Sequence, residues 1–225
     1  MMLSSRSSIL HCRSSILAWR SSMASTRSSM MSGDSGSSLI TAISFRGNLR
    51  LMIRILPSRK NLVLDLGDSV LKLYEDPQAL EVESGILGMC GRLPVPRVLG
   101  RGRMWVSMEK VGSETLMDAL AEGGCPDPGP FLDLIDLFND VVGLRWGDAN
   151  PRNFILGPRT YMVDFEEAHE GPAVADAASL LARVKLVNER CFGRYLRAAE
   201  DRYGPELRDF IKGELKLISF FRKVK

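Results

Sequence analysis

The spacing of apolar residues along the chain constrains its fold more than any other feature of the sequence. Between residues 39 and 109, apolar side chains come in short, loosely alternating runs, which are typical of half-buried strands. One stretch in this half, residues 79–89, has helical spacing instead, and Pro77 just before it suits a first helical turn. After residue 112 helical spacing dominates. The pattern predicts an α+β fold, in which a small sheet with one helix precedes a mainly helical part.

The turn residues place the expected elements more closely. Gly67-Asp68 lies between two apolar runs and predicts a tight hairpin, so the sheet should be antiparallel. Gly204-Pro205 separates the last two helical stretches. We expect strands at 39–45, 49–56, 61–66, 69–74, 98–99, 104–108 and 161–165, and helices at 79–89, 113–121, 131–142, 174–202 and 205–224.

Residues 1–38 form a leader whose composition differs from that of the rest of the chain. Its first 33 residues hold twelve serines, five methionines and four arginines but no acidic residue, and Arg-Ser-Ser recurs every seven residues from Arg6. Too few apolar side chains lie between these repeats to build a core. The composition is typical of a disordered low-complexity tail, and it also fits a translation start assigned upstream of Met52. A transit peptide is the second interpretation, and a nucleic-acid-binding arm is the third.

Composition and charge exclude several classes of protein. The chain is 45% hydrophobic and 25% charged and has no run of 18 apolar residues, so we expect no membrane-spanning helix. The net charge of +3 conceals a basic segment, since residues 1–60 hold nine of the 30 basic residues but one of the 27 acidic residues. Four separated cysteines and two histidines form no zinc-binding pattern. We expect buried free thiols in a reducing, cytoplasmic compartment.

Three polar side chains in the second half suggest a chemistry. Asp148 lies in the polar turn 147–152, Asn153 follows five residues later, and Asp164 comes after one further apolar run. A loop carboxylate can orient an attacking hydroxyl group, and an asparagine with an aspartate offers the oxygen ligands that Mg²⁺ prefers. The arrangement therefore contains parts that phosphoryl transfer needs.

The order of these residues resembles the catalytic loop D-x-x-x-x-N and the metal-binding D-F-G of the protein-kinase-like superfamily. This resemblance implies a bilobal fold, with an N-lobe at 39–111 and a helical C-lobe at 112–225. It also implies that Asp148 is catalytic, that Asn153 and Asp164 are metal ligands, and that the cofactors are ATP and Mg²⁺ or Mn²⁺.

Two residues of the first half extend the resemblance. Lys72 resembles the strand lysine that contacts the nucleotide phosphates and takes part in catalysis. Glu83 resembles the partner of this lysine on the following helix, although Glu81 competes for the same role. Both residues are therefore expected in the nucleotide-binding site.

The remaining matches follow in order along the chain. Glu109 and Val111 lie where the superfamily has the hinge whose backbone pairs with adenine. Residues 93–99 resemble the V-P-x-P segment of aminoglycoside- and choline-type phosphotransferases, and residues 176–181 resemble the helix that braces the catalytic loop. The resemblance covers about residues 60–200.

The sequence also departs from this superfamily. No G-x-G-x-x-G precedes Lys72, Trp146 replaces the histidine that usually opens the catalytic loop, and Glu166 replaces the glycine of D-F-G. The hydrogen bond that this histidine makes must therefore be lost or replaced. Twelve positions separate Asp164 from Asp176, which leaves no room for a long activation segment.

This shortness resembles the small atypical kinases of the RIO and KEOPS types. We therefore predict a serine/threonine protein kinase that transfers the γ-phosphoryl group of ATP to a protein substrate and that could act within a protein complex. One alternative is a small-molecule kinase of aminoglycoside or choline type, with an alcohol as acceptor. Another is a pseudokinase that docks a partner, which Trp146 and the missing glycine loop motivate. The basic residues of 205–225 are expected on the solvated side of a helix, with nucleic-acid binding a weaker interpretation, and no membrane partner is expected.

Overall fold

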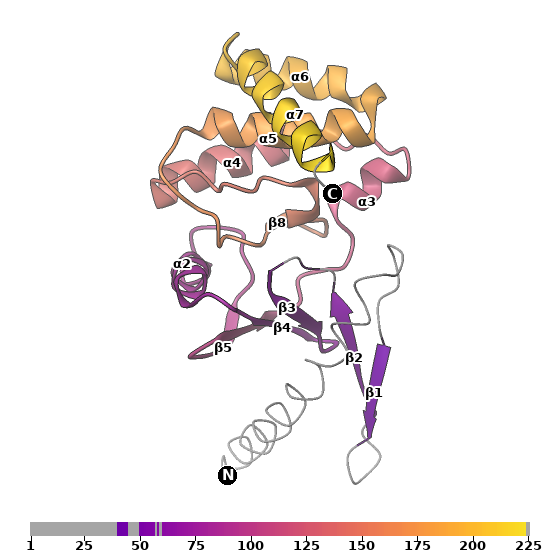
Figure 1. Ribbon diagram of the computed structural model, residues 1–225, viewed down its shortest axis with the longest axis vertical. Helices are drawn as coiled ribbons and strands as arrows, with labels where there is room; N and C mark the ends of the chain where they lie inside the picture. Colours follow the sequence, from indigo (N-terminus) through magenta and orange to yellow (C-terminus); the bar gives the residue numbers. More distant parts are fainter. Residues whose placement is uncertain (1–39, 45–49, 57, 59, 224–225) are drawn as a thin grey trace. The chain divides into compact units, whose positions relative to one another are not determined.

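The computed structural model describes residues 40–44, 50–56, 58 and 60–223, which form a six-stranded sheet, a short two-stranded sheet and a group of helices (Figure 1). The leader expected at 1–38 lies outside these residues, and the boundaries of the three expected segments stay predictions. In the part of the chain that is described, no helix is both long and apolar enough to cross a membrane.

Six strands form the main sheet: β1 (Ile40–Ser44), β2 (Arg50–Leu56), β3 (Leu62–Asp65), β4 (Ser69–Leu73), β5 (Val98–Gly102) and β6 (Trp105–Glu109). The sheet is antiparallel throughout, in the order β1-β2-β3-β4-β6-β5. The hairpin between β3 and β4 is confirmed, because Gly67 has φ +94° and its N–H donates to Asp65 Oδ1 at 2.9 Å. Lys72 on β4 lies opposite Val106 on β6, in an interior part of the sheet.

A single helix, α2 (Pro77–Leu87), follows β4 and contacts β6. Asp76 caps this helix by accepting a hydrogen bond from the Gln78 N–H at 2.8 Å, so the helix begins two residues before the expected start. The buried face of α2 carries Glu83 among apolar side chains. An acidic residue on a buried face needs a charged or hydrogen-bonding partner, which the site below supplies.

The second part consists of helices and two short strands: α3 (Leu116–Ala121), α4 (Gly129–Val142), the 3₁₀ turn η1 (Pro151–Asn153), β7 (Phe154–Ile155), β8 (Tyr161–Met162), α5 (Ala173–Val187), α6 (Glu189–Tyr203) and α7 (Leu207–Lys223). Helix α5 contacts α3, α4, α6 and α7 (Figure 1). Nine of its fifteen residues are buried, so it is the central helix of this group.

The helix expected at 174–202 is two helices that meet at Asn188. The Asn188 side chain accepts a hydrogen bond from the Cys191 N–H at 3.3 Å, which caps α6. Its amide nitrogen also donates to the carbonyls of Leu120 and Gly124, each at 3.1 Å. Because one amide group satisfies backbone atoms of two elements, the chain turns at Asn188 although the apolar periodicity continues through it.

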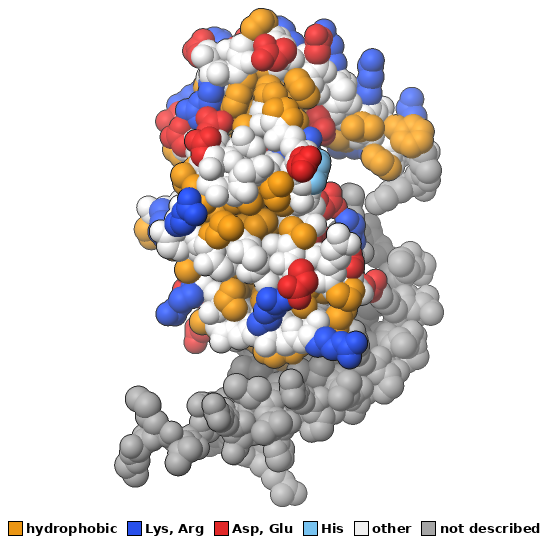
Figure 2. All heavy atoms as spheres, turned by 90° about the vertical axis from the view of Figure 1, so that its left-hand side faces the viewer, with side chains coloured by type: hydrophobic (Ala, Val, Ile, Leu, Met, Phe, Trp, Pro, Cys, Tyr) orange, Lys and Arg blue, Asp and Glu red, His pale blue; other side chains and the backbone are white. Residues whose placement is uncertain are grey.

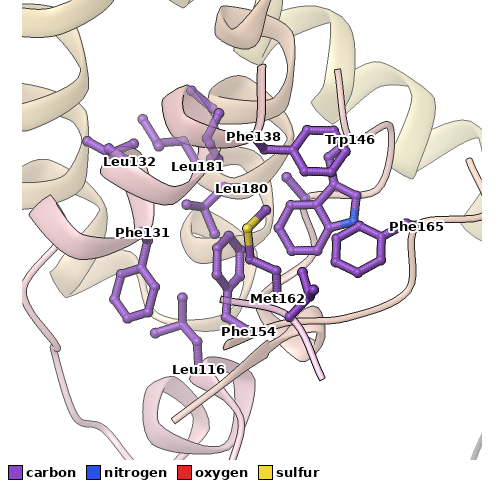
Figure 3. Close-up of a cluster of buried hydrophobic side chains, with 14 of the residues drawn as sticks. Leu116, Phe131, Leu132, Phe138, Trp146, Phe154, Met162, Phe165, Leu180 and Leu181 are labelled. Carbon is purple, nitrogen blue, oxygen red and sulfur yellow. The ribbon is translucent and has the colours of Figure 1, made fainter. Parts of the chain in front are cut away.

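An aromatic cluster lies at the centre of the helical part (Figure 3). The Trp146 ring stacks with those of Phe138 and Phe165. It meets Phe154 edge-on, and all four rings are fully buried. Aromatic side chains bury large apolar areas and make geometry-specific contacts. The segment just before Asp148 is therefore anchored in the core.

The expectation of free thiols is wrong for two of the cysteines. Cys125 and Cys191 form a disulfide across 66 positions, with their Cα atoms 5.5 Å apart, whereas Cys90 is free. The N-terminus of α6 lies against the loop after α3, which brings Cys191 beside Gly124. This proximity comes from helix packing, so cysteine spacing in the sequence could not reveal it.

Candidate active site

A buried carboxylate on α5 holds the loop that carries Asp148. Asp176, which is 1% exposed, accepts hydrogen bonds from the Trp146 N–H at 2.6 Å and the Gly147 N–H at 3.0 Å. Gly147 has φ +87°, and a Cβ there would collide with the Glu167 carbonyl, so this position requires glycine. Both features fix the backbone immediately before Asp148.

One amide group joins the candidate catalytic residue to a candidate metal ligand. Asn153 Nδ2 donates to the backbone carbonyl of Asp148 at 2.9 Å and to its Oδ2 at 3.1 Å. The Asn153 Oδ1 is then the atom that could hold a cation. Burial raises the pKa of the Asp148 carboxyl group, and the Arg183 guanidinium acts in the opposite direction.

Asp164 adopts a left-handed backbone conformation, with φ +68°, and no other non-glycine residue in the described ranges has a positive φ. The strand expected at 161–165 therefore ends at Met162. Trp146 Nε1 donates to the Asp164 carbonyl at 2.8 Å. This hydrogen bond helps to hold a conformation that costs about 1–2 kcal/mol. The indole thus supplies a loop-to-turn hydrogen bond where the expected histidine is missing.

Replacing Trp146 by Phe should destabilise the protein, because the ring would still pack but the part-buried Asp164 carbonyl would lose its donor. A buried polar group left without a partner costs about 1–3 kcal/mol. Urea unfolding followed by circular dichroism measures this loss. Trp105→Phe is the matched control, since Trp105 is only partly buried on β6. Equal losses in the two variants would contradict a special role for the Trp146 hydrogen bond.

Three carboxylates surround the Lys72 ammonium group. Its Nζ lies 2.7 Å from Glu83 Oε2, 2.5 Å from Asp164 Oδ1 and 3.5 Å from Glu166 Oε2. The Lys72 side chain is 8% exposed and that of Glu83 2%. Burial alone would lower the pKa of Lys72, but the three carboxylates raise it above its ordinary value, so the lysine keeps its charge.

The choice between Glu81 and Glu83, which the sequence left open, is resolved by the geometry of α2. Glu83 lies on the buried face and contacts Lys72. Glu81 lies on the exposed face and pairs with Arg101 at 2.5 Å. The two positions are two residues apart, so they face different sides of one helix.

The donor atoms of the site suit a hard divalent cation. Oxygen atoms of Glu83, Asp164 and Glu166 lie within 4.8 Å of one another, but all three side chains already contact the Lys72 ammonium group. The Asp164 side chain is 39% exposed, so this carboxylate can also be reached from outside the cluster. Carboxylate and amide oxygens are the ligands of Mg²⁺ and Mn²⁺, and the cluster contains no thiolate or imidazole of the kind that zinc favours. Asn153 and Asp164 remain the predicted ligands.

The predicted hinge lies at the other end of β4. Glu109 ends β6 opposite Ser69, three residues from Lys72, which is about 10 Å along a strand. Val111 lies in the linker from β6 to α3. In this linker a Cβ on Gly112 would lie 2.8 Å from the Ile155 side chain, so the linker packs closely on β7. Among the described residues, no hydrogen bond or ion pair joins the hinge to the carboxylate cluster. The predicted adenine-binding hinge and the predicted phosphate-binding Lys72 therefore lie at different positions along the sheet.

Some residues near the site were not expected from the sequence. Lys60 Nζ lies 2.5 Å from Glu167 Oε1, and Asn61 Nδ2 donates to Glu166 Oε2. These contacts join the segment before β3 to the turn after Asp164. Their partners are more than 100 positions apart, so no local pattern could indicate them.

Arg183 is a further residue that the sequence did not indicate. Its Nη2 lies 3.4 Å from Asp148 Oδ1. One signal was present, because Arg183 follows Asp176 by seven residues, which is about two turns of α5. The side of the helix that braces the loop therefore also presents this arginine.

The sheet with its single helix and the helical part that follows form the two-lobed fold of kinase-like phosphotransferases. The contacts of Lys72 with Glu83 and Asp164 join a strand of the sheet to α2 and to the turn after β8. Solved structures share this two-lobed fold. A co-crystal structure of WbdD with the kinase inhibitor LY294002 has a TM-score of 0.52 at 18% identity, covering 75% of this chain and 46% of that chain. A crystal structure of WbdD gives 0.50 at 18% identity, with 75% and 51% covered. The chain thus spans about half the length of the WbdD structures.

The crystal structure of aminoglycoside-3'-phosphotransferase of type VIII has a TM-score of 0.50 at 13% identity, covering 79% of this chain and 92% of that chain. At these identities the likeness concerns the fold alone. The model of the phosphotransferase enzyme family APH matches residues 132–210, a segment that contains Asp148, Asn153 and Asp164. A comparison with curated proteins finds no match.

Proposed function

We propose that this chain is an ATP-dependent phosphotransferase that moves the γ-phosphoryl group to a hydroxyl group. The observation that carries the proposal is the convergence of Lys72, Glu83 and Asp164, which come from a strand, a helix and a turn. Residues separated by as many as 92 positions meet at one buried ammonium group. The match of the helical part to a phosphotransferase family supports the same conclusion.

Each residue has a role that its surroundings suit. The Lys72 ammonium, held in place by Glu83, would bind the phosphate oxygens of ATP. Asp148 would orient the acceptor hydroxyl and accept its proton while the oxygen–phosphorus bond forms and the bond to the ADP oxygen breaks. The backbone of Glu109 and Val111 would bind adenine. A cation held by Asn153 and Asp164 would neutralise phosphate charge.

We favour a small-molecule alcohol as the acceptor. The similarity to the APH family supports this choice, because the match includes the whole predicted catalytic loop and metal turn. The short path from Asp164 to the start of α5 at Ala173 also leaves little chain that could support a peptide.

A protein hydroxyl is the second candidate acceptor, in the manner of RIO- and KEOPS-type serine/threonine kinases. The observation that favours it is the compactness of the helical part, in which α5, α6 and α7 follow one another with short connections. Little chain is then available to enclose a small molecule. A docking module without activity commonly lacks at least one catalytic group, whereas Lys72, Asp148, Asn153 and Asp164 are all present in this chain.

Incubation with γ-labelled ATP separates the candidate acceptors. We expect label transfer to a member of a panel of aminoglycosides, choline and other small alcohols, at a rate that depends on added Mg²⁺. Label on the chain itself or on added proteins, without turnover of any alcohol, would favour the protein acceptor instead. Failure of ATP to bind in the presence of Mg²⁺ or Mn²⁺, measured by calorimetry, would contradict the proposed function.

A nucleic-acid partner receives little support. On the face of the molecule shown in Figure 2, acidic and basic side chains are interspersed instead of forming one basic patch. On α7, Lys212 pairs with Asp209 at 2.9 Å, which reduces the local positive charge. Non-specific nucleic-acid binding depends on a continuous basic surface.

A further inference from the structure

The Asp148 carboxylate is approached from two sides by groups on different elements. Asn153 Nδ2, at the end of η1, donates to Oδ2 at 3.1 Å. Arg183 Nη2, on α5, lies 3.4 Å from Oδ1. The Asp148 side chain is 32% exposed, so it is reachable from solvent while both of its oxygens are contacted.

Arg183 is itself held by two further residues. Its Nη1 donates to the Ser179 carbonyl at 3.1 Å and to the Ser179 hydroxyl group. On α7, Glu214 Oε2 lies 3.8 Å from Arg183 Nη1 and accepts a hydrogen bond from Ser179 Oγ at 3.5 Å. Arg183 and Glu214 are each 23% exposed, so water screens this contact less than it would at the surface.

The packing of α7 on α5 makes this contact possible (Figure 1). Leu207 and Ile211 are buried residues of α7, and Glu214 follows Ile211 by three residues on the same side of the helix. A continuous path of contacts therefore runs from Glu214 on α7 through Arg183 to the Asp148 carboxylate.

The chemistry of arginine suits such a position. The planar guanidinium group has several donors in a fixed arrangement, so it can contact a carboxylate, a hydroxyl group and a second carboxylate at once. The terminal torsion of an aspartate has a broad energy well, so its orientation depends on what contacts its oxygens. Acidic side chains of Asp164 and Glu167 also act on Asp148, and Arg183 supplies the opposing positive charge.

We propose that Arg183 is a positioning residue, which orients the Asp148 carboxylate toward the acceptor hydroxyl group and is kept in place by Glu214 of α7. This inference rests on the proposed function. It adds a residue that acts through Asp148 and makes α7 part of the catalytic support.

The test compares steady-state release of inorganic phosphate from Mg-ATP, in which water serves as the acceptor. Arg183→Met should lower kcat about 10- to 100-fold, as expected when a catalytic group is misplaced, and should change the KM for ATP less than about twofold. Arg183→Lys should recover part of the rate, because it restores the charge but not the planar fork. Glu214→Gln should cause a smaller loss of kcat in the same direction. Arg197→Met, at an exposed position on α6, is the matched control and should leave kcat unchanged.

A double-mutant cycle separates positioning from a general structural effect. If Arg183 acts through Asp148, Arg183→Met should change the residual rate of Asp148→Asn less than about twofold. A full, additive loss in that background would overturn the proposal, as would an unchanged kcat in Arg183→Met. If Arg183→Met does not fold, Arg183→Lys and Glu214→Gln carry the same cycle.

The two failures are distinguishable. A wild-type protein whose phosphate release does not depend on Asp148 would refute the proposed function and this inference together. Phosphate release that depends on Asp148 but not on Arg183 would overturn this inference alone.

Discussion

Replacing Asp148 by Asn should lower turnover by about 10²–10⁴-fold and leave the affinity for Mg-ATP nearly unchanged. A positioned acid–base group contributes a factor of this size to the rate. Asparagine has the shape of aspartate, and its one carbonyl oxygen can still accept a hydrogen bond from Asn153 or from Arg183. It cannot take the proton of the acceptor hydroxyl group. Steady-state kinetics give the turnover, and calorimetry gives the nucleotide affinity.

The matched control for this variant is Asp140→Asn, at an exposed position on α4, which should behave like the wild type. Full activity in Asp148→Asn would remove Asp148 from the mechanism. A large fall in ATP affinity would instead indicate that the carboxylate organises the nucleotide site.

Removing the Asp164 carboxylate should abolish the increase in ATP affinity that Mg²⁺ produces. Without a bound cation, the phosphate groups would face the carboxylates of Asp164 and Glu166, whose negative charge Lys72 offsets only in part. Asp164 carries a formal charge and Asn153 does not, so Asp164→Ala should weaken the magnesium response more than Asn153→Ala. Calorimetric titration of ATP at increasing magnesium concentrations measures this response.

The backbone of Asp164 calls for a second variant in this experiment. Alanine is disfavoured at φ +68°, whereas asparagine tolerates this region. Asp164→Asn therefore removes the charge without adding backbone strain, and Asp201→Ala, an exposed site on α6, is the control. An equal magnesium response in the wild type and both Asp164 variants would contradict the metal assignment and much of the case for an active kinase.

The sequence was sufficient to predict the strands of the main sheet and the α2 helix, because these depend on local periodicity and turn residues. The hairpin at Gly67 is one example, since its glycine and the flanking apolar runs are all local. The order Asp148, Asn153, Asp164 was also readable, because the loop and turn that carry these residues are continuous segments of chain.

Contacts between residues far apart in the sequence could not be predicted in the same way. The break at Asn188 depends on carbonyl groups 64 and 68 positions away, so the apolar periodicity alone predicted one long helix. The Cys125–Cys191 disulfide has the same origin. The preference of Lys72 for Glu83 over Glu81 could have been inferred from the sequence, because Glu83 shares its side of the helix with Leu80 and Leu87.

The Trp146 indole is also a fluorophore, and it is hydrogen-bonded to the turn that carries the predicted metal ligand Asp164. Its Nε1 hydrogen bond to the Asp164 carbonyl links the emission of the ring to the backbone of that turn. The chain has three tryptophans, and Trp105 lies on β6 outside the buried aromatic cluster. With Trp19 and Trp105 replaced by phenylalanine, the intrinsic fluorescence would come from Trp146 alone. The emission of Trp146 could then report the binding of a cation or a nucleotide without an added label.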